Sequence, residues 1–379
     1  MPFPNRSAFA IPDDIAYLNC AYQGPLSTEV AAVGRDAFDR KATPWTIGPN
    51  DFFEDLERFR QALATLSGLD VDGFAVTPSA SYGISVAARN IEFGPTDEIV
   101  VLADQFPSNV YAWRECARRS GSTLVTIERS ADGGFTGPLI DAIGPRTALV
   151  ATAPCHWTDG TRLDLQAVSD AMPERAKLLL DTAQSFGAMG LGLDALAIDV
   201  LVGVTYKWLL GPYSVGFAWF APELRQGRPI EFNWIARADS ENFAGLVDYR
   251  VGFRAGARRY DVGEVSNFAL IPPALRAVEL ITEWGPAAIE RHAAPLIERA
   301  ATGAAAIGCT PVHDTLRAPH LTGLRLPEGV DPSAVAGVLA DHDVHVSVRG
   351  DSVRVSVHAF NTADDIDRLL AALAVALDR

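Results

Sequence analysis

Lys207 is the residue of this chain whose surroundings first point to chemistry. It lies in the stretch VLVGVTYKWLLGPYSVGFAWF, residues 200–220, where almost every neighbour is apolar. Lysine is among the residues that are least often buried without a partner. An amine that is kept from water has a lowered pKa, because burial disfavours its charged form, and the neutral amine is a nucleophile. The position therefore indicates either a reactive amine or a lysine paired with a carboxylate.

Polar groups also end two other strand-like segments. KLLLDTAQSFG, residues 177–187, supplies Asp181 and Gln184, while AVTPSAS, residues 75–81, supplies Ser79 and Ser81. In parallel α/β sheets, ligands bind beyond the carboxyl ends of the strands. We therefore expect these side chains to lie close to Lys207.

Together these groups meet three needs of pyridoxal phosphate (PLP). An amine forms a Schiff base with its aldehyde, a carboxylate keeps its pyridine nitrogen protonated, and a helix N-terminus binds its phosphate. Lys207, Asp181 and the turn 78–81 would supply these groups in that order. Two plainer interpretations stay open at this point. Asp181 and Lys207 could form a satisfied ion pair, and the turn could be only a helix N-cap.

The elements that must position these residues alternate between helix-like and strand-like patterns. Residues 52–68 space their apolar side chains at helical intervals, and a helix is expected to begin near Ser81 after a short strand. Short apolar runs predict further strands at residues 97–103, 147–153, 177–181, 199–205 and 215–220. Runs that are apolar on both faces are typical of a mainly parallel sheet buried between helices.

The pattern changes after about Pro272. Residues 274–308 resemble one long amphipathic helix, followed by strand-like runs at 321–326, 344–348 and 353–358 and a closing helix over 364–379. We predict a large α/β domain over residues 20–270. Residues 1–19 and 271–379 are predicted to form a smaller α+β domain.

Composition narrows the possible partners. The 379 residues carry a formal net charge of −15, which argues against nucleic-acid binding and against binding to an anionic membrane. Any basic site must therefore be local. The four cysteines are widely spaced and predict free thiols in a reducing compartment rather than a disulfide framework or a metal site. With no secretory signal and no apolar run long enough for a bilayer, we expect a soluble cytoplasmic protein.

Residues 178–217 resemble the signature of the class V aminotransferase family of PLP-dependent enzymes. The matching positions are Asp181, Ala183, Gln184, Asp199, Lys207, Gly211 and Pro212. Further segments resemble the family in YLNCAYQGPL, PSASYGI, DQFPSNVYAW and VRVSVHAFNTADDID, so the likeness spans most of the chain. The resemblance implies the type I PLP-dependent transferase fold, with a mostly parallel sheet between helices and a small C-terminal domain. It also implies a homodimer.

The resemblance assigns a role to each matching position. Lys207 would hold the cofactor as an internal aldimine and then carry protons, and Asp181 would face the pyridine nitrogen. Gln184 would donate to the phenolic oxygen. The remaining cofactor contacts would come from Ala80 and Ser81 at the phosphate, Phe106 stacked on the ring and Ala183 packed beneath it.

Two positions depart from the family pattern. Tyr206 precedes the lysine where many members have histidine, and its hydroxyl is expected to reach the phosphate. The Gly-Thr phosphate contact that members donate across the dimer appears here as Gly263-Glu264, so we expect Ser266 or Asn267 to replace it.

At the substrate end, Arg354 is expected to grip the substrate carboxylate with its guanidinium fork. Arg349 is a weaker second candidate. His156 follows a strand-like run and is a candidate acid/base group, although a structural hydrogen bond explains a histidine there equally well.

An amino-acid aminotransferase is the leading functional hypothesis. The alternatives are a lyase or hydrolase of the kynureninase or C–S lyase kind and an epimerase, because all begin by removing the α-proton of an amino acid joined to the cofactor as an external aldimine. Desulfurase chemistry is disfavoured, since no cysteine lies between Val330 and Arg354, where the family places its nucleophilic thiol. A non-catalytic ligand-binding module is the remote alternative.

Overall fold

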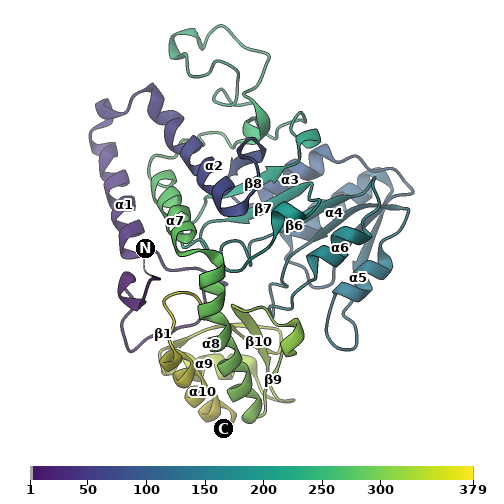
Figure 1. Ribbon diagram of the computed structural model, residues 1–379, viewed down its shortest axis with the longest axis vertical. Coiled ribbons are helices and arrows are strands. Elements are labelled where there is room, and N and C mark those ends of the chain that lie inside the picture. Colours follow the sequence, from purple (N-terminus) through teal and green to yellow (C-terminus); the bar gives the residue numbers. More distant parts are fainter. Residues whose placement is uncertain (1–2, 379) are drawn as a thin grey trace.

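Residues 3–378 are described by the structure, a computed structural model, and Figure 1 shows them as a large sheet among helices with a smaller sheet below it. The large sheet has seven strands in the order β2-β8-β7-β6-β5-β3-β4. Only β8 runs antiparallel to its neighbours. The strands are β2 (Phe74–Thr77), β3 (Glu98–Leu102), β4 (Thr123–Ile127), β5 (Thr147–Thr152), β6 (Lys177–Asp181), β7 (Val200–Val204) and β8 (Gly216–Phe220).

Helices cover both faces of this sheet, which explains the continuous apolar runs. In β3, Ile99 and Val101 pack into the core beneath α3 and α4, while Val100 and Leu102 face the opposite core beneath α2, α5, α6 and α7. The mostly parallel sheet between helices predicted from the sequence is therefore confirmed. The helices are α1 (Thr28–Asp39), α2 (Glu54–Ser67), α3 (Ala80–Asn90), α4 (Ser108–Ser120), α5 (Thr136–Ala142), α6 (Leu165–Ala171) and α7 (Ile271–Trp284).

Strand β4 was missed by the sequence analysis. It forms the edge of the sheet and pairs only with β3. Its residues are mostly exposed or half-buried, so it lacks the continuous apolar run that marks the other strands. An edge strand is covered on fewer sides, and the burial signal weakens accordingly.

The smaller part of the chain is built on a four-stranded antiparallel sheet in the order β12-β13-β10-β9. The N-terminal strand β1 pairs in parallel with β11 in a separate two-stranded sheet, which Figure 1 shows next to α8 and α10. The elements of this smaller part are β1 (Ala16–Tyr17), α8 (Pro286–Ala306), β9 (Thr310–Pro311), β10 (Leu321–Arg325), α9 (Pro332–Asp341), β11 (Val344–His345), β12 (Ser347–Arg349), β13 (Ser352–Ser356) and α10 (Ala363–Leu377).

The single long helix expected over residues 274–308 is wrong. The chain forms α7 and α8 instead, separated at Gly285, whose φ of 80° lies outside the helical region. Pro286 follows at the first position of α8, where its missing N–H breaks no helical hydrogen bond. None of the helices within residues 3–378 is long and apolar enough to cross a membrane.

The hydrophobic cores do not divide at residue 271, where the sequence analysis placed the start of the small domain. The buried face of α7 belongs to the core of the large sheet, and the small core takes over within α8, from Ala293 onward. Ala16 and Leu18 do belong to the small core. We therefore propose a boundary inside α8; residues 1, 2 and 379 of the predicted small domain lie outside the described part of the chain.

Candidate active site

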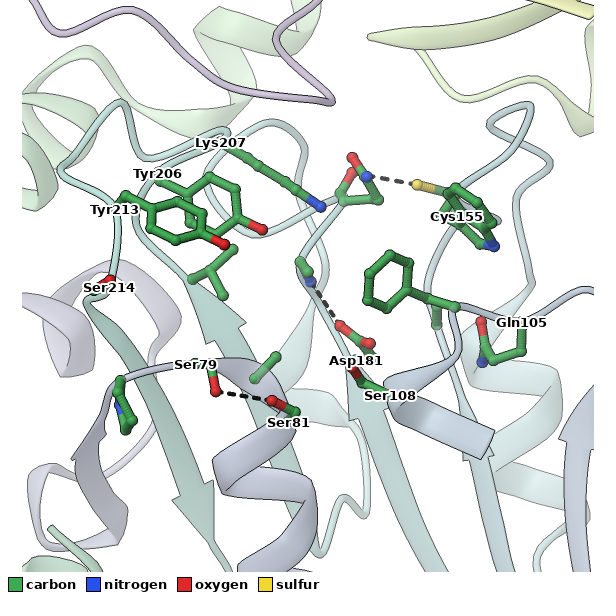
Figure 2. A pocket seen from close by; sticks show the side chains of 18 residues that line it. Ser79, Ser81, Gln105, Ser108, Cys155, Asp181, Tyr206, Lys207, Tyr213 and Ser214 are labelled. Atoms are coloured by element: carbon green, nitrogen blue, oxygen red, sulfur yellow. Dashed lines mark hydrogen bonds between the residues drawn. The ribbon is translucent and has the colours of Figure 1, made fainter. Parts of the chain in front are cut away.

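A cavity of about 370 Å³ opens where β6 and β7 end and α3 begins. Figure 2 shows the amine of Lys207 and the carboxylate of Asp181 both directed into this space. We call it the cofactor cavity. Its walls are Pro78, Ser79, Ala80, Ser81, Gln105, Phe106, Ser108, Ala153, Cys155, Trp157, Asp181, Ala183, Gln184, Val204, Tyr206, Lys207, Tyr213 and Ser214.

Lys207 is buried, and its amine makes no ion pair with Asp181. Burial lowers its pKa to about 8, an effect that Asp181 opposes and that Arg354 reinforces. The Nζ atom lies 5.6 Å from the ring centroid of Phe106 and 5.5 Å from that of Tyr206. The paired-lysine interpretation therefore does not describe this residue, which is an amine partly neutral near physiological pH.

The loop around Lys207 is held by a close backbone contact. The Gly24 N–H donates to the carbonyl of Tyr206 at 2.8 Å. A Cβ at Gly24 would lie 2.1 Å from the carbonyl oxygen of Lys207, so only glycine fits there. Two non-glycine residues after the lysine, Leu210 and Ser214, have positive φ values of 54° and 67°. Such backbone strain gathers at functional sites.

Asp181 ends β6 and is buried. Burial raises the pKa of its carboxyl, while the Ala183 N–H, which donates to Oδ1 at 3.1 Å, and the charge of Lys207 lower it. A buried carboxylate needs a charged or hydrogen-bonded partner. The protonated pyridine nitrogen of PLP is such a partner, so this wall of the cavity fits the expected cofactor.

The start of α3 forms the lower end of the cavity in Figure 2. Ser79 caps the helix, since its Oγ accepts from the Tyr82 N–H at 3.2 Å, and it lies 2.9 Å from the Ser81 Oγ. Residues at the first turn of a helix have N–H groups without helical partners, and the helix dipole favours an anion there. The turn is thus an N-cap, as the plainer interpretation held, and its remaining donors also suit a phosphate.

Gln184 is oriented by a neighbour that the sequence analysis did not consider. The indole Nε1 of Trp208 donates to Gln184 Oε1 at 3.0 Å, and the amide Nε2 donates to the Ala21 carbonyl at 3.1 Å. Indole can only donate, so it fixes which side of the amide carries nitrogen. The second Nε2 hydrogen is left for the cavity, as expected for a donor to the phenolic oxygen. The only sequence signal for Trp208 is its place next to Lys207.

Phe106 lines the cofactor cavity and is 39% exposed. Its ring meets that of Trp157 edge-on, with centroids 5.4 Å apart and an interplanar angle of 88°. A half-exposed aromatic ring in a cavity wall offers a free face for stacking. Ala183 and Tyr206 also line the cavity, and burial raises the pKa of Tyr206 to about 12, so its hydroxyl remains a hydrogen-bond donor.

A second cavity of about 370 Å³ adjoins the first, sharing Phe106, Trp157, Gln184, Tyr206, Lys207 and Tyr213 as walls. We call it the substrate cavity. It adds Ala21, Tyr22, Gln23, Arg349 and Arg354. Arg354 donates from Nη1 to the Trp157 carbonyl at 2.8 Å, but its buried Nε and Nη2 have no partner among the described residues. Burial lowers the pKa of Arg354 to about 9, so the group stays charged at neutral pH.

His156 is not part of either cavity. It is fully buried, its ring stacks on Phe135 at 5.2 Å, and its nitrogens bond to the Thr158 hydroxyl and the Ala103 carbonyl. Burial lowers its pKa, and its ring is held by hydrogen bonds and stacking as a structural residue. The interpretation as an acid/base group does not fit this position, because the strand-end loop turns the ring inward.

The expected replacements for the family's Gly-Thr contact are also engaged elsewhere. Ser266 donates to the Phe52 carbonyl at 2.6 Å, and Asn267 accepts from the backbone at the start of α7. The Gly263 N–H donates to Glu231, and Glu264 has a φ of 55°. None of these residues lines the cofactor cavity of this chain.

Two cysteines lie close to the lysine. Cys155 lines the cofactor cavity, where its Sγ donates to the Gln184 carbonyl at 3.3 Å, and Cys20 donates to the Lys207 carbonyl at 3.6 Å. Burial raises the pKa of Cys155 to about 12 and also raises that of Cys20. Both therefore remain thiols and are poor nucleophiles.

Several cavity residues escaped the sequence analysis. Gln105 has a buried Nε2 without a partner in the described chain, and Ser108, Tyr213 and Ser214 complete the walls. Ser214 follows the Gly-Pro turn of the signature, and Gln105 and Ser108 flank Phe106. In the sequence, only their closeness to these positions indicated a role in the site. The unpaired Gln105 amide, together with Lys207 and Asp181 in the wall of the cavity, fits a bound PLP.

Comparisons with known proteins show the family and the fold of this chain. The family model described as "Aminotransferase class-V" matches residues 49–369. The isopenicillin N epimerase of Streptomyces clavuligerus is 26% identical, over 97% of this chain and 96% of that protein. An uncharacterized aminotransferase of Bacillus subtilis is 24% identical, over 99% and 98%. A solved structure described as a C-DES mutant with glycine linked to its PLP cofactor superimposes with a TM-score of 0.87 at 20% identity, over 98% and 99%.

Proposed function

This chain belongs to the class V aminotransferase family of PLP-dependent enzymes, and we propose that within it the chain is an amino-acid aminotransferase. One observation carries the proposal. A single amine, that of Lys207, has its pKa brought to about 8 in a cavity where Cys155 and Tyr206 have theirs raised to about 12. One base that can both take and return a proton is what transamination needs.

The cofactor contacts follow from the cavity walls. Asp181 would face the pyridine nitrogen, Gln184 the phenolic oxygen, and Ala80 with Ser81 the phosphate. Phe106 would stack on one face of the ring and Ala183 would pack on the other. The bound cofactor supplies an electron sink that makes the α-proton of an attached amino acid removable.

Arg354 would orient the substrate. Its unpaired Nε and Nη2 lie on one edge of the guanidinium, and this edge can donate to both oxygens of a carboxylate. The Trp157 carbonyl holds the opposite nitrogen, so the fork is positioned before the substrate arrives. A carboxylate fixed there would present the α-carbon to the cofactor cavity, which shares six of its walls with the substrate cavity.

Lys207 would then carry the proton. Its amine, neutral in part at physiological pH, is able to accept the α-proton, and the conjugate acid can return it to a different carbon on the same face. An epimerase needs a second acid on the opposite face, and the shifted groups of the cavity supply none with a pKa near neutrality. The hypothesis of one shuttling base therefore favours transamination over inversion.

Desulfurase chemistry stays disfavoured. β12 ends at Arg349 and β13 begins at Ser352, so only Gly350 and Asp351 join the two strands. A hairpin of this length leaves no mobile loop that could bring a thiol to the substrate. The free cysteines near the site are the buried Cys20 and Cys155.

A homodimer is the expected assembly. Phe232, Val247, Tyr249 and Val251 are 65–90% exposed on the segment that Figure 1 shows projecting from the large domain, and Trp45 is 80% exposed. Exposed apolar side chains in such number mark a protein–protein interface. The four free cysteines suit a reducing compartment, which supports a cytoplasmic location.

A single-turnover experiment tests the proposal. Holoenzyme is mixed with a panel of amino acids without a keto-acid acceptor, and the visible spectrum of the cofactor and the products are recorded. An aminotransferase leaves the cofactor in its amine form and releases one keto acid per site. A lyase restores the starting spectrum and releases ammonia, pyruvate or alanine, while an epimerase yields the other enantiomer. Either of the last two results would overturn the aminotransferase assignment, and Lys207→Arg provides the inactive control.

A further inference from the structure

The substrate cavity holds a second arginine whose charge the proposed chemistry does not use. Arg349 ends β12 and donates from Nη1 to the carbonyl of Val348 at 2.7 Å, while its Nε is buried without a partner in residues 3–378. Its guanidinium carbon lies 5.5 Å from the ring centroid of Trp157. Burial lowers the pKa of Arg349, although a guanidinium remains charged at neutral pH.

Among residues 3–378, no acidic side chain lines the substrate cavity to balance this charge. Its walls contain two arginines and Lys207 but no aspartate or glutamate. The described residues place no carboxylate within 4.0 Å of either guanidinium, and the charge of Arg349 helps to lower the pKa of Arg354. In a chain with a net charge of −15, such a basic pocket is unusual. Arg354 is fully buried and Arg349 is half-buried, and a charge held away from water needs a partner, so the ligand is the group that can supply one.

One carboxylate is enough for Arg354 alone. Its free Nε and Nη2 form a complete two-donor edge, which satisfies both oxygens of an α-carboxylate. Trp157 anchors the two arginines separately, Arg354 through its carbonyl and Arg349 through the face of its indole. The donors of Arg349 therefore remain for a different anion.

We infer that the substrate is an amino acid with a second acidic group, which Arg349 binds while Arg354 binds the α-carboxylate. This inference rests on the proposed function, since it names the substrate class of the same site. An anionic side chain would neutralise the pocket, whereas a neutral side chain would leave Arg349 uncompensated. Arg349 is thus the specificity-determining residue.

Binding of unreactive ligands tests the inference without any turnover. Succinate and its half-amide succinamate differ only in the charge of one end, and neither has an amino group that could react. Titration calorimetry on the holoenzyme is expected to show at least about tenfold tighter binding of succinate, as for other charge-assisted contacts. Arg349→Gln is expected to abolish that preference, and Arg349→Lys to restore part of it.

The matched control is Arg325→Gln. Arg325 is exposed on β10 of the same small sheet and lines neither cavity, so its removal lowers the charge of the chain equally. Equal affinity of the wild type for the two ligands would overturn the inference. So would an equal loss of both ligands in Arg349→Gln, because Arg349 would then share the α-carboxylate. Transamination of neutral amino acids alone would overturn the inference while leaving the proposed function intact. A preference for succinate in a protein that does not transaminate would support the acidic substrate class and overturn the proposed function.

Discussion

The lowered pKa of Lys207 can be measured directly, because the chain has only three lysines, Lys41, Lys177 and Lys207. With a pKa of about 8, roughly one Lys207 in ten is neutral at pH 7. An ordinary lysine with a pKa near 10.5 is neutral in roughly one molecule in three thousand. The structure therefore predicts about 300-fold more reactive amine at this position.

The assay is brief acylation of the cofactor-free protein at a series of pH values, followed by digestion and mass spectrometry of the three lysine peptides. The midpoint of the pH profile is the quantity to compare, since limited access to a buried amine slows labelling at every pH alike. Lys41 is exposed and monitors the reagent, while Lys177 pairs with Asp199 and gives a second reference. The Lys207 peptide is expected to show a midpoint near pH 8.

Two variants make the reasoning sharper, because they must shift this midpoint in opposite directions. The carboxylate of Asp181 raises the pKa of Lys207, so Asp181→Asn is expected to lower the midpoint further. The guanidinium of Arg354 lowers that pKa, so Arg354→Gln is expected to raise it. A wild-type midpoint near that of a solvent-exposed lysine, or shifts of the same sign in both variants, would refute the account.

Three further predictions concern the supports of the site. Trp208→Phe leaves the buried Gln184 oxygen without its donor, which should lower the unfolding free energy by about 1–3 kcal/mol and change the visible spectrum of the bound cofactor. The control is Trp219→Phe, whose indole N–H bonds to the distant Asp70 carbonyl and whose loss should lower stability without changing that spectrum. If the two variants have the same cofactor spectrum, Trp208 does not position Gln184. Arg354→Lys keeps the charge but loses the fork, so kcat/KM should fall at least about tenfold, and an unchanged value would show that the carboxylate binds elsewhere. Asp261→Asn removes the buried carboxylate that pairs with the fully buried Arg60 and leaves only the half-buried Glu57, 3.4 Å from the Arg60 Nε. Urea denaturation should show a loss of about 3–5 kcal/mol, whereas a loss near zero would mean that Glu57 is enough to compensate the guanidinium.

Much of the fold could be predicted from the sequence, because a buried strand is a continuous run of apolar residues. β3, β5, β6, β7 and β8 are buried along almost their whole length, so each is a continuous apolar run, and the punctuation by glycine, proline and aspartate marks their ends. The break between α7 and α8 was missed although Trp284-Gly285-Pro286 signalled it, because the apolar spacing continues on both sides. The edge strand β4 was missed because it is not buried.

The candidate site divides in the same way. Asp181, Lys207 and the turn at Ser79 could be predicted together, since each ends a strand or begins a helix at one edge of a parallel sheet. The direction of a side chain within a loop has no such rule. His156 therefore turned out to be buried against Phe135, although its position in the chain resembled that of the other candidates.

The family, most of the elements and the candidate cofactor residues could be predicted from the residues alone, because these depend on local pattern and on motif. The three-dimensional arrangement was needed to show that Lys207 makes no ion pair with Asp181, that Trp208 orients Gln184, and that Trp157 contacts two arginines from the far end of the chain. These are contacts between segments that lie far apart in the sequence or between side chains whose directions the backbone pattern leaves open. Only the packing of the folded chain sets these contacts. The packing also places the two arginines for which we infer an acidic substrate.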